Sequence, residues 1–140
     1  MNQQTKTDLS SQLDSRFWKI SFLIIGLLTA FGVLPSIVDP VTALKDFSPE
    51  VEINPFTAYL FRTFFVMVCA MGLCYVLLAS RPSRYPGLAI LGMLGKFSFA
   101  LGVFLHYSSG ILSPLALIIA FLDTGMGVIF ALFVMKYFRG

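Results

Sequence analysis

Four long apolar stretches constrain this chain more than any other feature, because each is long enough to cross a lipid bilayer. A transmembrane helix needs about 20 apolar residues to span a hydrocarbon core of about 30 Å. The stretches that reach this length are residues 17–38, 56–79, 87–107 and 111–135. The sequence therefore predicts an all-α, polytopic membrane protein built as a bundle of four transmembrane helices.

The composition agrees with a chain that lies mostly in lipid. Hydrophobic residues make up 57% of the sequence and charged residues only 12%, whereas soluble domains are typically about 25% charged. The net charge of +3 is small and scattered, so we expect a lipid bilayer as the surroundings and no nucleic acid as a partner. A single histidine excludes a multi-histidine metal centre within one chain, and we expect no metal and no cofactor.

The loops alternate in charge along the chain, and this predicts an orientation. Residues 16–19, 81–84 and 136–139 are basic, whereas residues 39–55 are acidic and include a short stretch, 41–47, that suits an interfacial helix. Because basic segments stay on the cytoplasmic side, both termini are expected inside and the first loop outside. Residues 1–15 then form a mobile or interfacial cytoplasmic tail, and residues 16–140 form the membrane domain.

Two charged residues lie near the middle of the third and fourth apolar stretches. Lys96 is eleven residues before Tyr107, and Asp123 is twelve residues after Ile111. At about 1.5 Å per residue both lie roughly 16–18 Å below the same membrane surface. An isolated charge is costly at this depth and needs a partner. The sequence therefore predicts a buried Lys96–Asp123 ion pair, which either fixes helix register, forms a ligand or proton site, or contacts a partner subunit.

A third charge, Arg62, lies early in the second stretch. It either anchors its helix at the membrane surface or reaches inward to Lys96 and Asp123. If all three meet, two cations face one anion, and the centre suits an amphipathic or anionic molecule. Residues that could line such a pocket are Phe99, Phe121 and His106, although His106 equally suits a hydrated surface position.

The chain resembles the broad DoxX-like group of small four-helix bacterial membrane proteins. The residues that carry the resemblance are Arg62, Gly72-Leu73-Cys74-Tyr75, Arg81-Pro82, Gly95-Lys96 and Asp123. The resemblance implies a multi-pass protein of the bacterial inner (cytoplasmic) membrane. Some members of the group are subunits of membrane oxidoreductases, and similar four-span bundles bind lipophilic molecules.

Three functions remain open from the sequence. The first, which we favour, is a non-enzymatic accessory or assembly subunit that contacts other membrane proteins. The second is a binding protein or transporter for a small amphipathic or anionic molecule at Arg62, Lys96 and Asp123. The third is a membrane isomerase or a quinone-linked oxidoreductase subunit. The sequence contains no HExxH, GxSxG or Walker motif, so no residue is expected to be catalytic.

Overall fold

The computed structural model describes residues 11–139, and within them every regular element is helical. Four helical segments are long and apolar enough to cross a membrane, the first of them running through both α2 and α3 (Arg16–Val38), which confirms the four long apolar helices expected from the sequence. The helices are α2 (Arg16–Gly32), α3 (Leu34–Val38), α4 (Pro40–Phe47), α5 (Pro55–Ser80), α6 (Pro86–Tyr107) and α7 (Pro114–Arg139), with a short 3₁₀ turn at Pro82–Arg84.

Proline sets where most of these helices begin. Pro40, Pro55, Pro86 and Pro114 are the first residues of α4, α5, α6 and α7. Proline suits the first turn because its missing N–H would have no partner there and its φ angle is already helical. Pro114 also explains why α7 begins three residues later than its apolar stretch. Pro35 similarly lies at the start of α3, after α2 has ended.

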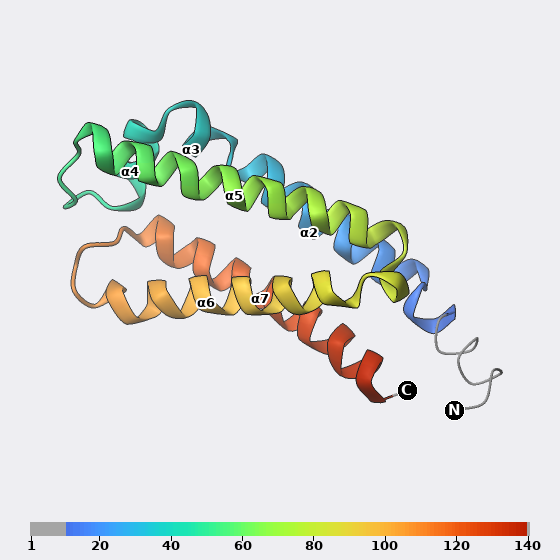
Figure 1. Cartoon of the computed structure of the whole chain (residues 1–140). Coiled ribbons are helices and arrows are strands. Elements are labelled where there is room, and N and C mark those ends of the chain that lie inside the picture. The colour runs from blue at the N-terminus through green and yellow to red at the C-terminus, as the bar shows by residue number, and fades with distance from the viewer. Residues whose placement is uncertain (1–10, 140) are drawn as a thin grey trace.

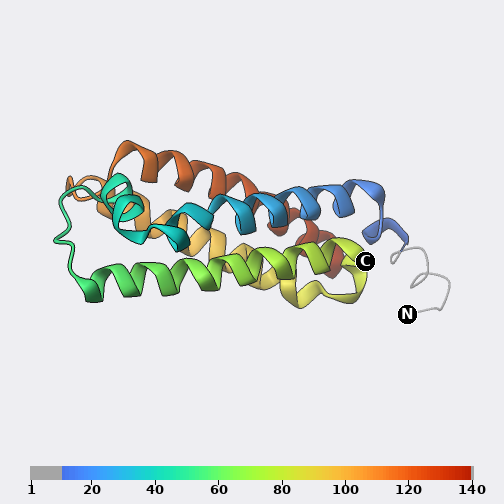
Figure 2. The ribbon, with the colours of Figure 1, turned by 90° about the horizontal axis from the view of Figure 1, so that it is seen from above.

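The long helices form two layers, with α2 and α5 in one layer and α6 and α7 in the other (Figure 1). The start of α2 and the end of α7 lie at the same end of the bundle (Figure 2). We call this the terminal end, and it also holds the 81–85 turn. The opposite end holds the 39–54 loop and the 108–113 turn, and we call it the loop end.

Glycines allow the two helices of each layer to approach closely. A side chain added at Gly72 of α5 would come within 2.5 Å of the Ala30 backbone nitrogen in α2, and one at Gly26 would meet Val76. In the other layer, a side chain at Gly92 of α6 would overlap the ring of Phe130 in α7. Small residues drive close helix packing in membranes, so each layer behaves as a tightly packed helix pair.

The two layers meet in an aromatic core near the terminal end. Phe22 of α2 stacks on Phe130 of α7 at 5.2 Å between ring centroids, and packs edge-on against Phe133 at 5.1 Å. Trp18 packs on the same two rings, Phe22 and Phe133. All three phenylalanines are fully buried. Aromatic rings bury large areas, so this cluster is a substantial apolar contact between the layers, beside that of α5 with α6.

Packing near the loop end differs, because the buried residues there are small. Ala100 and Val103 of α6 pack against Ala116 and Ala120 of α7. The 39–54 loop is joined to this end by two hydrogen bonds: the Ser48 hydroxyl donates to the Ile111 carbonyl at 2.7 Å, and the Ser113 N–H donates to the Phe47 carbonyl at 3.0 Å. Thus α4 is fixed beside the loop end of α6 and α7.

Residues 1–10 of the expected polar tail lie outside the described part of the chain. Residues 11–15 differ from the expected mobile or interfacial segment. Leu13 is 1% exposed and belongs to the aromatic core cluster. Asp14 accepts hydrogen bonds from the backbone and the hydroxyl of Ser83, at 2.9 and 2.7 Å. Leu13 therefore anchors this segment in the core, and Asp14 attaches it to the 81–85 turn.

Candidate functional site

Lys96 and Asp123 form the predicted ion pair between α6 and α7. The Lys96 ammonium donates to the Asp123 carboxylate, with 2.6 Å between Nζ and Oδ1. Their side chains are only 9% and 14% exposed. No other salt bridge occurs between described side chains. The sequence-based prediction of this buried pair is confirmed.

Small residues on both helices allow the pair to form. Gly92, Lys96 and Ala100 follow one stripe of α6, and all three are buried. On α7, Ala120 and Gly127 are buried on either side of Asp123. Removing a charge from water is expensive unless a partner compensates it. The close approach of the two helices supplies that partner at hydrogen-bond distance, so the pair links α6 and α7 in mid-span.

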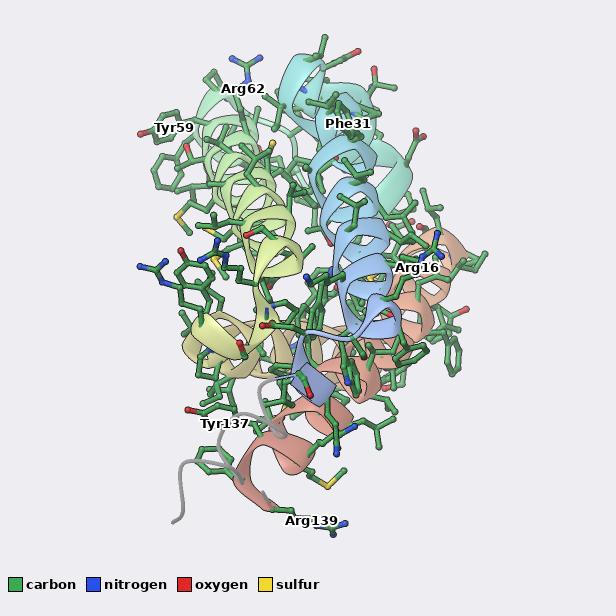
Figure 3. The ribbon with its side chains drawn as sticks, turned by 90° about the vertical axis from the view of Figure 1, so that its right-hand side faces the viewer. Arg16, Phe31, Tyr59, Arg62, Tyr137 and Arg139 are labelled. Atoms are coloured by element: carbon green, nitrogen blue, oxygen red, sulfur yellow. The ribbon has the colours of Figure 1, made fainter. Side chains whose placement is uncertain are left out.

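Arg62 does not join the pair. It is exposed on α5, and Figure 3 shows it near the loop end, pointing away from the α6–α7 layer. Its positive charge instead interacts with the carboxylate of Asp39, which follows the end of α3. Hydrogen bonds from the side chain and backbone of Thr42 lower the pKa of the Asp39 carboxyl, and Arg62 lowers it further. The hypothesis of a three-charge centre at Arg62, Lys96 and Asp123 therefore lacks the required geometry.

Two of the three expected pocket residues line a different feature. An open apolar groove of about 460 Å³ runs between the 39–54 loop and the loop end of α6. Phe99 and His106 both line it, whereas Phe121 is 63% exposed and packs on Phe104 of the same layer. Other lining residues are Leu44, Phe47, Phe61, Ser98, Gly102 and Leu112. Lys96 and Asp123 are not among the lining residues, so the groove is separate from the ion pair.

His106 lies at the rim of this groove and is exposed. Its ring nitrogen Nδ1 lies 2.8 Å from the Gly102 carbonyl one turn earlier. If the ring is neutral, this contact makes Nδ1 the donor and leaves Nε2 as an acceptor. The described residues contain no cluster of three or more His, Cys, Asp or Glu that could hold a metal ion.

A second face of α6 was missed in the sequence. Gly95, Ser98 and Gly102 lie on one side of the helix, and a side chain added at either glycine would meet nothing within 4 Å. The Ser98 hydroxyl has no hydrogen-bond partner within residues 11–139. By contrast, the Thr124 hydroxyl on α7 donates to the Ala120 carbonyl at 2.8 Å. The spacing of small residues at 95, 98 and 102 is the signal that would have revealed this face.

The fold and the buried pair define a class: a helical bundle with four helices of membrane-spanning length and a charged link inside one layer. No protein-family model, curated protein or solved structure matches the chain. The resemblance to the DoxX-like group therefore has no support from these comparisons, and function has to be argued from the residues of this chain.

Proposed function

We propose that this protein is a non-enzymatic accessory subunit of a membrane complex, and that α6 binds a transmembrane helix of its partner. The observation that carries the proposal is the small-residue face at Gly95, Ser98 and Gly102, in which Gly95 and Ser98 are exposed and Gly102 is half-buried at the apolar groove. Glycine weakens a helix by roughly 0.5–1 kcal/mol relative to alanine. Its presence on an open face of a membrane helix suits a close contact that the chain itself does not make.

Four of the other glycines within the long helices support this interpretation, whereas Gly125 of α7 is open. Gly26, Gly72, Gly92 and Gly127 each lie against a neighbouring helix, where any side chain would overlap another atom. They show how this chain uses glycine inside its own layers. The α6 face offers the same small-residue surface and adds an unpaired hydroxyl at Ser98. Serine hydroxyls form hydrogen bonds between membrane helices, so a partner helix would satisfy it.

The ion pair has a defined role in this proposal. At about 100° per residue, Ser98 lies roughly 160° around α6 from Lys96. Because Lys96 is held against Asp123 on α7, the Ser98 face is turned away from α7. The pair thus fixes the rotation of α6 and turns the small-residue face away from α7, with Ser98 and Gly102 at the apolar groove.

We further propose that the terminal end lies in the cytoplasm of a bacterium, with the 39–54 loop outside the inner membrane. The basic residues of the terminal end and the acidic residues of the loop support this orientation. Single cysteines at Glu50 and Ser80, both exposed, would test it in a chain without Cys69 and Cys74. An impermeant maleimide applied to intact cells should label position 50 and leave position 80 unlabelled. The opposite pattern would reverse the orientation.

Photo-crosslinking in the native membrane tests the partner. A benzoylphenylalanine at Ser98 should crosslink to one membrane protein, and replacing Gly95 and Gly102 together with leucine should abolish that product. Leu73 of α5, which is 59% exposed, is the matched control position and should give lipid adducts only. Gly125→Leu, at an open glycine of α7, controls for the substitution itself. Lipid adducts alone from position 98 would contradict the proposal.

A second function is favoured by the apolar groove at the loop end. A groove of about 460 Å³ with Phe99 on its wall and His106 at its rim suits a lipophilic molecule with one polar group. Sites for small molecules are mostly apolar with a few placed polar groups. Under this alternative, His106→Ala, Phe99→Ala and Gly102→Leu would each reduce the amount of a co-purifying small molecule, because all three residues line the groove. Gly95→Leu, at a glycine outside the groove, would leave that amount unchanged.

A further inference from the structure

A second open cavity lies at the terminal end, on the opposite half of α6 from the small-residue face. It has a volume of about 570 Å³ and is lined by residues 84–88, 90 and 91. Arg84 is its only charged lining residue. The others include Tyr85 and the apolar side chains Leu88, Ile90 and Leu91. The cavity thus has a cationic end at the helix turn and an apolar wall along the start of α6.

Arg84 is free to bind an anion. Its side chain is exposed and, within residues 11–139, forms no salt bridge; its guanidinium carbon lies 5.8 Å from the centroid of the Tyr85 ring. The acid attached to the same turn is Asp14, and both of its oxygens already accept hydrogen bonds from Ser83. These bonds hold the turn in place without neutralising Arg84.

The charge of the whole terminal end favours an anionic ligand. Among residues 11–139, this end holds one acid, Asp14, against six cations: Arg16, Lys19, Arg81, Arg84, Lys136 and Arg139. Figure 3 shows Arg16 and Arg139 from this end of the bundle. Basic clusters next to transmembrane helices attract anionic lipid headgroups by about 1 kcal/mol per cation.

We propose that this cavity binds one anionic phospholipid, with its phosphate on Arg84 and part of an acyl chain along Gly87 and Leu91. Charge complementarity supports the headgroup position, and the membrane-spanning length of α6 supports the acyl position. The space in front of Gly87 is open, since no atom lies within 4 Å of where a side chain would begin. An acyl chain could therefore lie directly against the backbone of α6 at this position. Arginine is suited to the headgroup since its planar guanidinium can bind a phosphate through two parallel hydrogen bonds.

Native mass spectrometry and thermal unfolding of the full chain in an uncharged detergent test this site. Phosphatidylglycerol should bind and raise the midpoint of unfolding, whereas phosphatidylcholine with the same acyl chains should bind much less. Inorganic phosphate at equal concentration should have no effect. Arg84→Gln should weaken phosphatidylglycerol binding about tenfold, the expected loss for one charge-assisted contact. Arg139→Gln, an exposed arginine outside the cavity, should retain it.

A second variant tests the acyl position independently of charge. Gly87→Leu should place a side chain in the proposed acyl path and reduce phosphatidylglycerol binding while the protein without lipid unfolds at its usual temperature. Equal binding of the two lipids, or unchanged binding in either Arg84→Gln or Gly87→Leu, would overturn the proposal. A full effect from inorganic phosphate alone would also overturn it, since the site would then bind a free anion instead of a lipid.

Discussion

Removing Asp123 should destabilise the protein more than removing Asp123 and Lys96 together. Asp123→Ala leaves the Lys96 ammonium buried without the carboxylate that now lies 2.6 Å away. Lys96 has no other hydrogen-bond partner among the described residues. Combining Asp123→Ala with Lys96→Met keeps an unbranched side chain in the same space and removes the stranded charge.

The magnitude follows from the burial of the two side chains. At 9% and 14% exposure, neither charge can regain much hydration when its partner is lost. Breaking a buried pair costs about 3–5 kcal/mol in soluble proteins. This corresponds to a factor of roughly 10² to 10⁴ in the unfolding equilibrium. Replacing both partners with apolar groups is often close to neutral, so the double variant should recover at least about 2 kcal/mol.

Equilibrium unfolding of the detergent-solubilised protein with a denaturing detergent would measure these free energies. The full cycle needs the wild type, both single variants and the double variant. Lys136→Met, which removes a lysine from the last turn of α7, controls for the loss of a positive charge and should change stability little. If the effects of the two single variants simply add in the double variant, then Lys96 and Asp123 do not stabilise one another.

Three further predictions use the same unfolding assay. Gly72→Ala should lower the free energy of unfolding by about 1–3 kcal/mol, because the added carbon would lie 2.5 Å from the Ala30 backbone nitrogen. Its control, Gly125→Ala, adds a carbon that meets nothing within 4 Å and should stabilise α7 by about 0.5–1 kcal/mol. Phe22→Ala should cost about 3–5 kcal/mol because its ring is fully buried, whereas the change Phe17→Ala, at a ring 64% exposed, should cost far less. Asp14→Ala should cost about 2 kcal/mol through the loss of its two bonds to Ser83. Equal effects within either matched pair, or an unchanged stability for Asp14→Ala, would contradict the packing described above.

The helices and the ion pair were predictable because strong, local signals determine them. Length and hydropathy locate the four spans, and proline at the start of a span fixes its boundary within a few residues. Lys96 and Asp123 were predictable as partners because hydrocarbon tolerates neither charge alone and both lie at the same depth. Arg62 lies near the start of α5, where its long side chain can reach out of the apolar region. Its depth in the sequence pattern therefore did not show whether it pairs with Lys96 and Asp123 or points to the surface.

Features that depend on how the helices rotate against each other could not be read from the sequence. The same type of residue, glycine, is packed at Gly92 and open at Gly95, and only the structure separates these cases. The burial of Leu13 and the attachment of Asp14 to the 81–85 turn were also missed. It joins residues 69 positions apart through two hydrogen bonds, and nothing in the polar composition of the first fifteen residues indicates such a contact.

Native mass spectrometry of the protein after gentle extraction tests the proposed function most directly. We expect a complex of this chain with a second membrane protein, which dissociates when Gly95 and Gly102 are both replaced with leucine and persists in Gly125→Leu. A mass that corresponds to the chain with lipids alone, or to the chain with one small lipophilic molecule, would contradict an accessory subunit. The second of these results would favour the apolar groove beside Phe99 as the functional site.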